Sequence, residues 1–170
     1  GVTTITAPVD YLCNNVLDVR LEHIGSSRGV INLDSLGQIL SMGKGYTRFS
    51  AKASSLSLPS LQTANQVIFE ANEGGSIEVN GPHAVSYSCI GFWTDYSNST
   101  LTYYHNLMTA VGADSILDLS AIETIDAGFN STGNDNDIQI ITASEGAFID
   151  LSGVTTITAP VDYLCNNVLD

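Results

Sequence analysis

The chain has 170 residues, of which 44% are hydrophobic and 14% charged, and its formal net charge is −13 because 5 basic residues face 18 acidic ones. The length fits a single domain over residues 1–170 with a substantial core, and the hydrophobic content argues against intrinsic disorder. The charge argues against nucleic acid as a partner, because phosphate binding needs Lys and Arg. No apolar run approaches the length of a membrane span, so membrane insertion is not expected.

Five short stretches with alternating apolar and polar residues recur along the chain. Small-residue turns, such as ANEGG and ASEGA, precede some of them. Alternation with a period of two, without a helical period, predicts an all-β chain. The central apolar pairs are, in chain order, Ile31/Leu33, Leu56/Leu58, Ile77/Val79, Leu117/Leu119 and Ile149/Leu151.

Residues 1–18, GVTTITAPVDYLCNNVLD, recur without change as residues 153–170, an offset of 152 positions (153 − 1). The spacings between successive stretches, continued to the position where a further copy of the first stretch would begin, add up to the same 152 residues. We interpret the chain as one 152-residue tandem repeat plus an 18-residue overlap, and its start at Gly as a sign of a fragment or processed form. An engineered chain with duplicated termini and a recent gene-level duplication are the alternatives.

The recurring strand–turn–strand unit predicts the architecture. A degenerate unit of about 20–25 residues is typical of a parallel β-solenoid, or β-helix, here with about five coils per 152-residue repeat and with loop insertions. In such a coil, one row of apolar side chains stacks on the same row of the next coil. A β-sandwich also has short strands, but it does not explain why similar units recur. A leucine-rich repeat would need a helical half, which this sequence lacks.

Three segments interrupt the regular spacing and are expected to form loops: residues 8–15, 88–106 and 128–137. Asn98 and Asn130 begin N-x-S/T sequences in two of them, so both are glycosylation candidates, with coincidence as the alternative. The aromatic residues of the second segment suit either sugar stacking or an interface with a neighbouring subunit, or a loop that folds back over the strands. They are Phe92, Trp93, Tyr96, Tyr103 and Tyr104.

The third segment is rich in carboxylate and amide oxygens, which are the ligands that calcium prefers. The spacing differs from an EF-hand loop, and an Asn/Asp turn explains the same composition without a metal. No other cofactor is predicted. The candidate calcium ligands are Asp126, Asn134, Asp135, Asn136 and Asp137.

The cysteines occupy two independent positions, because Cys165 copies Cys13. Either a disulfide between Cys13 and Cys89 or free thiols fit this count, and no zinc-ligand spacing is present. The three histidines lie in three different units and are expected in turns or at the surface.

The sequence predicts no enzyme. Asp118 and Asp150 occupy the polar position between two apolar anchors, as Glu78 does, and stacked carboxylates are what a polysaccharide-cleaving site would need. Such a site also needs basic partners, which are scarce here, and an outward polar ladder explains the pattern without catalysis. The TTIT stretch suggests an ice-binding threonine ladder, but the aligned stretches ETID, GQIL and LQTA do not keep Thr at one position.

The units ILDLSAIETI, from Ile116, and FIDLSGVTTI, from Phe148, resemble the parallel β-helix repeats of large secreted bacterial surface proteins, including adhesins and fibre-forming proteins. The resemblance implies an extracellular or cell-surface location. It also implies a structural module that forms or extends a surface filament or adhesin stalk by coaxial stacking. The expected partner is a further copy of the repeat, with glycans as a second class. A carbohydrate-binding or polysaccharide-cleaving β-helix is the alternative function.

Overall fold

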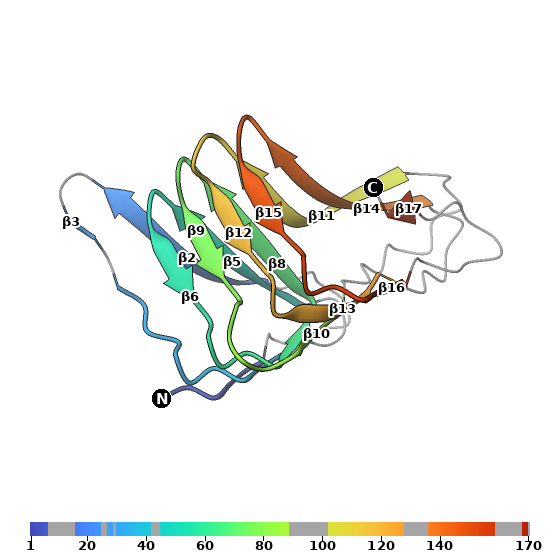
Figure 1. The fold of residues 1–170 in the computed structure, drawn as a ribbon, viewed down its shortest axis with the longest axis horizontal. Helices are drawn as coiled ribbons and strands as arrows, with labels where there is room; N and C mark the ends of the chain where they lie inside the picture. The colour runs from blue at the N-terminus through green and yellow to red at the C-terminus, as the bar shows by residue number, and fades with distance from the viewer. Residues whose placement is uncertain are drawn as a thin grey trace.

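The computed structural model describes residues 1–6, 16–24, 27–28, 30–41, 45–88, 102–127, 136–158 and 168–169. All regular secondary structure among these residues is β-strand, arranged in three sheets whose strands are parallel apart from one short pair. The prediction of an all-β chain with parallel strands is therefore confirmed (Figure 1). The described residues contain no helix of the length and apolarity needed to cross a membrane.

Sheet I consists of short parallel strands in the order β1-β4-β7-β10-β13-β16, so that every third strand of the chain enters it. Its strands are two to five residues long, and none of them has more than two buried side chains. The strands are β1 (Thr4–Ile5), β4 (Gln38–Leu40), β7 (Thr63–Asn65), β10 (Val85–Ser88), β13 (Ile122–Asp126) and β16 (Thr156–Thr158).

Sheet II has the longest strands, in the order β17-β14-β11-β8-β5-β2-β3. All neighbours are parallel except β3, which turns back antiparallel against the last residues of β2. The strands are β2 (Val16–Ile24), β3 (Ser27–Arg28), β5 (Tyr46–Lys52), β8 (Val67–Asn72), β11 (Thr102–Val111), β14 (Asn136–Ser144) and β17 (Val168–Leu169).

Sheet III contains the parallel strands β15-β12-β9-β6. Its register places the predicted apolar anchors opposite one another: Leu56 pairs with Ile77, Ile77 with Leu117, and Leu117 with Ile149. The strands are β6 (Ser55–Ser57), β9 (Ser76–Glu78), β12 (Ile116–Asp118) and β15 (Phe148–Asp150).

From β4 to β15 the chain passes through the three sheets in the same order each time, for example β4, β5 and β6 followed by β7, β8 and β9. We call one such passage a circuit. Figure 1 shows strands of successive circuits side by side, with the colour advancing along the long axis of the molecule. Each circuit thus pairs with the circuit before it and the circuit after it, which is why apolar residues recur at equivalent positions.

The core between the sheets is mostly aliphatic and contains three aromatic side chains that lie near one another. Phe49 and Phe69 stack with ring centroids 6.0 Å apart, and Phe69 lies 6.3 Å from Tyr87. All three are fully buried. The Tyr87 hydroxyl donates a 2.7 Å hydrogen bond to the Val67 carbonyl, so this polar atom does not carry the cost of an unsatisfied buried group.

Repeated tight turns connect sheet II to sheet III. Their residues adopt positive φ angles, at Glu73 (51°) and Gly74 (77°), and again at Glu145 (56°) and Gly146 (83°). The Ser115 hydroxyl joins two adjacent turns, because it donates to the Val111 carbonyl (2.7 Å) and accepts from the Gly74 amide (3.0 Å). The small-residue stretches seen in the sequence therefore mark the corners between these two sheets.

Two predicted loops end earlier than expected. Strand β11 begins at Thr102, so Tyr103 and Tyr104 belong to a strand, and β14 begins at Asn136. The reason is mutual pairing, since Thr102 lies opposite Asn136 and the two strands run together from there. The expectation that all histidines lie in turns or at the surface is also wrong, because His105 is buried within β11.

Candidate functional site: the two ends of the strand stack

The buried row of sheet I is covered in its middle and open at one end. Ile39, Ala64, Tyr87 and Ile125 lie opposite one another in successive strands and are at most 1% exposed. Ile157 continues the row in β16 but is 52% exposed. Its side chain has the type and register of a core residue, yet no further strand of the described chain covers it.

The two identical segments lie at opposite ends of the same sheets. Strand β1 and strand β16 are the outermost strands of sheet I, and β16 begins at Thr156, the copy of Thr4. Strand β17 is the outermost strand of sheet II on the side away from β2, and it begins at Val168, the copy of Val16. Figure 1 shows β2 and β17 toward opposite ends of the long axis.

The two copies use opposite strand edges. In the first copy, Ile5 pairs with Ile39 of β4, whereas in the second copy the equivalent Ile157 pairs with Ile125 of β13. In sheet II, Val16 pairs with Tyr46 of β5, whereas Val168 pairs with Ile138 of β14. The same short sequence is thus seen with a partner strand on each of its two edges.

Carboxylates form a row along sheet III, as the polar ladder predicted. Asp118 lies opposite Glu78 on one side and Asp150 on the other. All three are partly exposed. Such a row is the feature that a carbohydrate-cleaving site would use, so its hydrogen bonding decides what it can do.

Hydrogen bonds engage two of these carboxylates in the turns that follow their strands. Asp118 accepts from Asn80 Nδ2 (2.7 Å), Ser120 Oγ (2.7 Å) and the Ser120 amide (3.2 Å). Asp150 accepts from the Ser152 amide (2.8 Å). Burial pushes the pKa of Asp118 upward, but hydrogen bonds from Ser120 and Asn80 outweigh it, so the pKa lies below its usual value. Asp118 is therefore held as a charged turn residue and is poorly suited to donate a proton.

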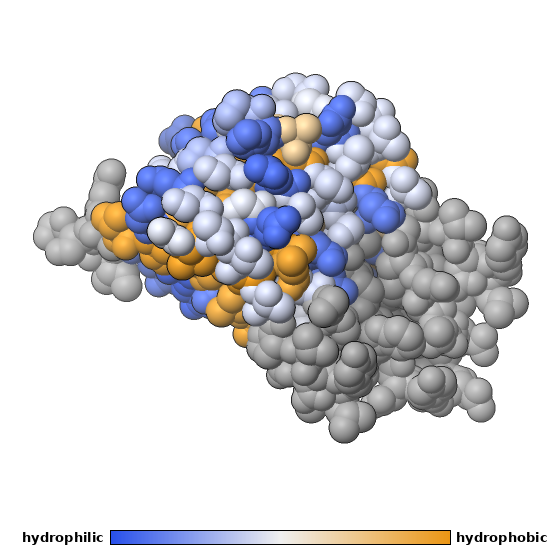
Figure 2. Space-filling view, turned by 90° about the horizontal axis from the view of Figure 1, so that it is seen from below, coloured by the Kyte–Doolittle hydropathy of each residue, from blue (hydrophilic) through white to orange (hydrophobic). Residues whose placement is uncertain are grey.

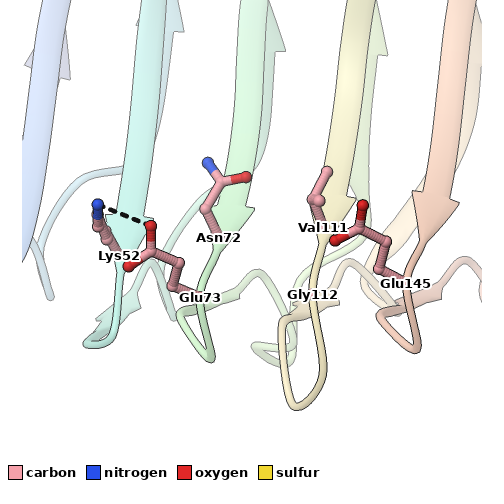
Figure 3. A pocket seen from close by; sticks show the side chains of 6 residues that line it. All are labelled: Lys52, Asn72, Glu73, Val111, Gly112 and Glu145. Atoms are coloured by element: carbon pink, nitrogen blue, oxygen red, sulfur yellow. Dashed lines mark ion pairs between the residues drawn. The ribbon is translucent and has the colours of Figure 1, made fainter.

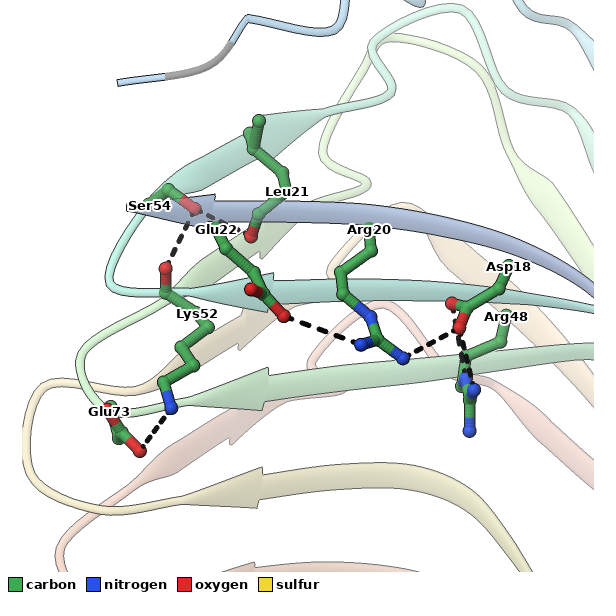
Figure 4. Close-up of polar contacts among 8 residues, drawn as sticks. All are labelled: Asp18, Arg20, Leu21, Glu22, Arg48, Lys52, Ser54 and Glu73. Carbon is green, nitrogen blue, oxygen red and sulfur yellow. Dashed lines mark hydrogen bonds and ion pairs between the residues drawn. The ribbon is translucent and has the colours of Figure 1, made fainter. Parts of the chain in front are cut away.

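An ion-pair cluster lies on the outer side of β2 and β5 (Figure 4). Asp18 Oδ2 lies 2.7 Å from Arg48 Nη2 and 2.8 Å from Arg20 Nη2, while Arg20 Nη1 lies 3.6 Å from Glu22 Oε1. The hydrogen bond from Arg48 is the main reason that the pKa of Asp18 is lowered. In the next strand, burial raises the pKa of Glu70. These basic residues are neutralised locally, so they do not form a free anion-binding surface.

A groove of about 420 Å³ lies where sheet II turns into sheet III (Figure 3). Lys52 Nζ lies 2.8 Å from Glu73 Oε1, and this hydrogen bond raises the pKa of Lys52. Its cation is therefore already paired with a carboxylate. The lining residues are Lys52, Asn72, Glu73, Val111, Gly112 and Glu145.

Hydroxyl side chains recur at equivalent positions along sheet I. The comparison of ETID, GQIL and LQTA made from the sequence was shifted by one residue in the third stretch. The stretch equivalent to ETID and GQIL is QTAN and not LQTA, because Thr63 lies opposite Gln38 and Ser86. The row of side chains that includes Thr63 also contains Gln38. The row two residues further along each strand contains Leu40 and Asp126. Sheet I is therefore not a uniform threonine array, although the stretches compared in the sequence were not the ones that lie opposite one another.

Most of the site residues predicted from the sequence lie outside the described residues. Tyr104 is 67% exposed in β11, Tyr103 precedes it in the same strand, and Asp126 is exposed at the end of β13. Asn136 and Asp137 begin β14, and the part of the chain that the structure describes holds no cluster of three or more potential metal ligands. The predicted roles of all these site residues stay predictions, and those outside the described residues are Cys13, Cys89, Phe92, Trp93, Tyr96, Asn98, Asn130, Asn134, Asp135 and Cys165.

The described residues on the face drawn in Figure 2 are mainly hydrophilic. In Figure 2, charged and polar residues cover much of the view, and hydrophobic residues form a band along one border. Among the described residues, the exposed large hydrophobic side chains are Val2, Val16, Val30, Tyr104, Ile116, Phe148 and Ile157.

No family model matches this chain, and no curated protein or solved structure is significantly similar to it.

Proposed function

We propose that this chain is a structural repeat module, a β-solenoid of about five coils per 152-residue repeat that stacks coaxially on further copies. Stacked in this way, the repeats form or extend an extracellular filament or an adhesin stalk at a cell surface. The circular order of the three sheets and the row-by-row register of the apolar anchors support the solenoid. The extracellular location rests on the resemblance to secreted β-helix repeats.

The opposite edges used by the two identical segments carry this proposal. If β1 and β16 are the same strand of a continuous array, its neighbours are β13 of one repeat and β4 of the next. The buried row then runs without interruption from Ile125 through one copied isoleucine to Ile39. The chain contains both halves of the junction that a tandem array would form.

The edge of β2 supports the same arrangement in sheet II. Strand β3 pairs only with His23 and Ile24, which leaves residues Val16–Glu22 without a neighbour on that side among the described strands. The β14–β17 register places Ile138 opposite the copy of Val16. Continued in step, it would set Ser144, the last residue of β14, opposite Glu22. Residues Ile138–Ser144 of β14 would thus cover the whole open edge from Val16 to Glu22.

Open strand edges explain why stacking is favourable. An exposed row of backbone N–H and C=O groups invites pairing with another chain, and natural proteins cap or cover such edges. A continuous array pairs every circuit except the last. The alternative of a polysaccharide-cleaving β-helix finds less support, because Asp118 is held charged in a turn and Lys52 is already paired. Duplicated termini introduced by engineering remain the alternative for the repeat itself.

A chain with two repeats tests the proposal. Residues 1–152 followed by residues 1–170 should form one continuous stack, which adds five circuits at about 4.8 Å each, or about 24 Å. Small-angle X-ray scattering of this chain and of the 170-residue chain measures the increase in maximum dimension. An increase well beyond that value, with two separately tumbling bodies, would show that the repeats do not stack and would end the proposal.

A further inference from the structure

Each end of the molecule is completed by a segment with the same sequence. The N-terminal place, beside β4 and β5, holds β1 and the start of β2 from the first copy, and the C-terminal place, beside β13 and β14, holds β16 and β17 from the second copy. Either copy therefore has the side chains that either place requires. Two identical segments and two places within one chain are the condition for exchange between molecules.

We propose that the two copies are interchangeable, and that a second copy of this chain is the partner. One shared copy then joins the C-terminal end of one molecule to the N-terminal end of the next. This inference rests on the coaxial stacking proposed above, and it names the segment through which two molecules would join. The partner is not a different protein, because only this sequence is seen seated at both places.

The register of such a junction follows from the pairs already present. If residues 153–170 of one molecule remain on their own β13 and β14, their free edge meets the partner's β4 and β5. Ile157 then lies opposite the partner's Ile39, and Val168 opposite the partner's Tyr46, as Ile5 and Val16 do within one chain. Ile157, which is 52% exposed, becomes a covered member of the row.

Within the copied segment, exchange conserves strand pairs, and this limits how strongly the molecules join. When one molecule donates its copy, the partner's own copy leaves β4 and β5, so the pairs gained replace the pairs lost. The intramolecular copy has the advantage of a high effective concentration, because it is tethered beside its place. The natural chain is therefore expected to be mainly monomeric when dilute, and weakening one of the two copies should promote joining.

Aspartate substitutions at the two equivalent isoleucines test this. In Ile5→Asp, the first copy would place a carboxylate at a partly buried position, which weakens its binding and favours residues 153–170 of another molecule in its place. In Ile157→Asp, the second copy is weakened, which favours residues 1–18 of another molecule in the place beside β13. In the double variant neither copy fits. Thr4→Asp and Thr156→Asp are matched controls, since they add the same charge at exposed neighbouring positions.

Sedimentation velocity over an about hundredfold concentration range measures the outcome. Each single isoleucine variant should form head-to-tail oligomers at a concentration at least about tenfold lower than the natural chain. The double variant and both threonine controls should not. This ranking of the variants by their tendency to form oligomers distinguishes exchange from aggregation, because aggregation caused by misfolding would be strongest in the double variant.

Monomeric single variants with intact circular dichroism spectra would overturn the proposal, as would a double variant that associates as strongly as the single ones. If an aspartate variant fails to fold, Ile5→Thr and Ile157→Thr, with their double variant, repeat the comparison with a milder change. Scattering from the two-repeat chain is independent of these results, because its repeats are joined covalently. Failure of exchange would therefore leave the stacking proposal standing, and failure of stacking would be seen separately.

Discussion

Replacing Ile125 and Ile157 by alanine compares a covered and an uncovered position of the same buried row. The two residues lie opposite each other in β13 and β16. Ile125 is 1% exposed and Ile157 is 52% exposed. The pair therefore has the same chemistry and register, and differs in whether a following circuit covers the side chain.

The structure sets the expected magnitudes. Ile125→Ala removes fully buried methyl and methylene groups and leaves a cavity between neighbouring strands, which costs about 2–5 kcal/mol of the free energy of unfolding. Ile157 keeps about half of its surface in water, so Ile157→Ala loses part of the transfer term and leaves no enclosed cavity. Its expected cost is about 1 kcal/mol.

Urea-induced unfolding followed by circular dichroism measures both costs. The same substitution at residue 157 of the two-repeat chain provides the decisive comparison, because the second repeat would then cover the side chain. There its cost should rise into the range of Ile125→Ala. Equal costs at the two positions in the 170-residue chain would refute the open-end reasoning, and an unchanged cost in the two-repeat chain would show that the next circuit does not cover Ile157.

Two further predictions concern the body of the stack. Gly81→Ala should lower stability by about 1–3 kcal/mol or more, because a Cβ atom there would lie 1.8 Å from the Pro59 carbonyl oxygen and the backbone must shift. Gly37→Ala, where the nearest atom would lie 3.7 Å away, is the matched control in thermal unfolding. Glu70→Gln should raise the free energy of unfolding at pH 7 by less than about 1 kcal/mol, since the half-buried carboxylate is screened by solvent. Burial raises the folded-state pKa of Glu70 above its ordinary 4.5, so this gain should be present above the folded-state pKa and vanish as pH falls below 4.5.

A specific result would contradict each of these two predictions. Equal melting temperatures for the two glycine variants would show that the backbone at residue 81 has room that the structure denies. A Glu70→Gln variant that is less stable at pH 7 would mean that attraction to Arg48, which lowers the pKa of Glu70, outweighs the burial of the carboxylate.

Local alternation in the sequence was enough to predict the strands and their buried sides. Pairs such as Leu117/Leu119 alternate with a polar residue, and a strand sends successive side chains to opposite faces. The recurrence of these pairs also predicted the carboxylate row of sheet III, because equivalent residues of neighbouring parallel strands lie opposite each other. The 152-residue period needed only the comparison of the chain with itself.

Register and strand length depended on contacts between distant residues. Thr63 lies opposite Gln38 because of packing between circuits, and no local pattern distinguishes that pairing from one shifted by a residue. Strand β11 extends back to Thr102 because β14 runs beside it, and Asp18 meets Arg48 across 30 positions of sequence. The burial of His105 follows from the same pairing.

The same distinction between what the sequence determines and what the tertiary structure determines applies to the duplicated segment. Sequence alone determined that residues 1–18 and 153–170 are identical and that they stand 152 positions apart (153 − 1). Only the tertiary structure decided that the copies lie at opposite ends of the same sheets and use opposite edges. The physical reason is that a strand has two hydrogen-bonding edges, and which edge is occupied depends on the neighbouring circuit rather than on the strand's own residues.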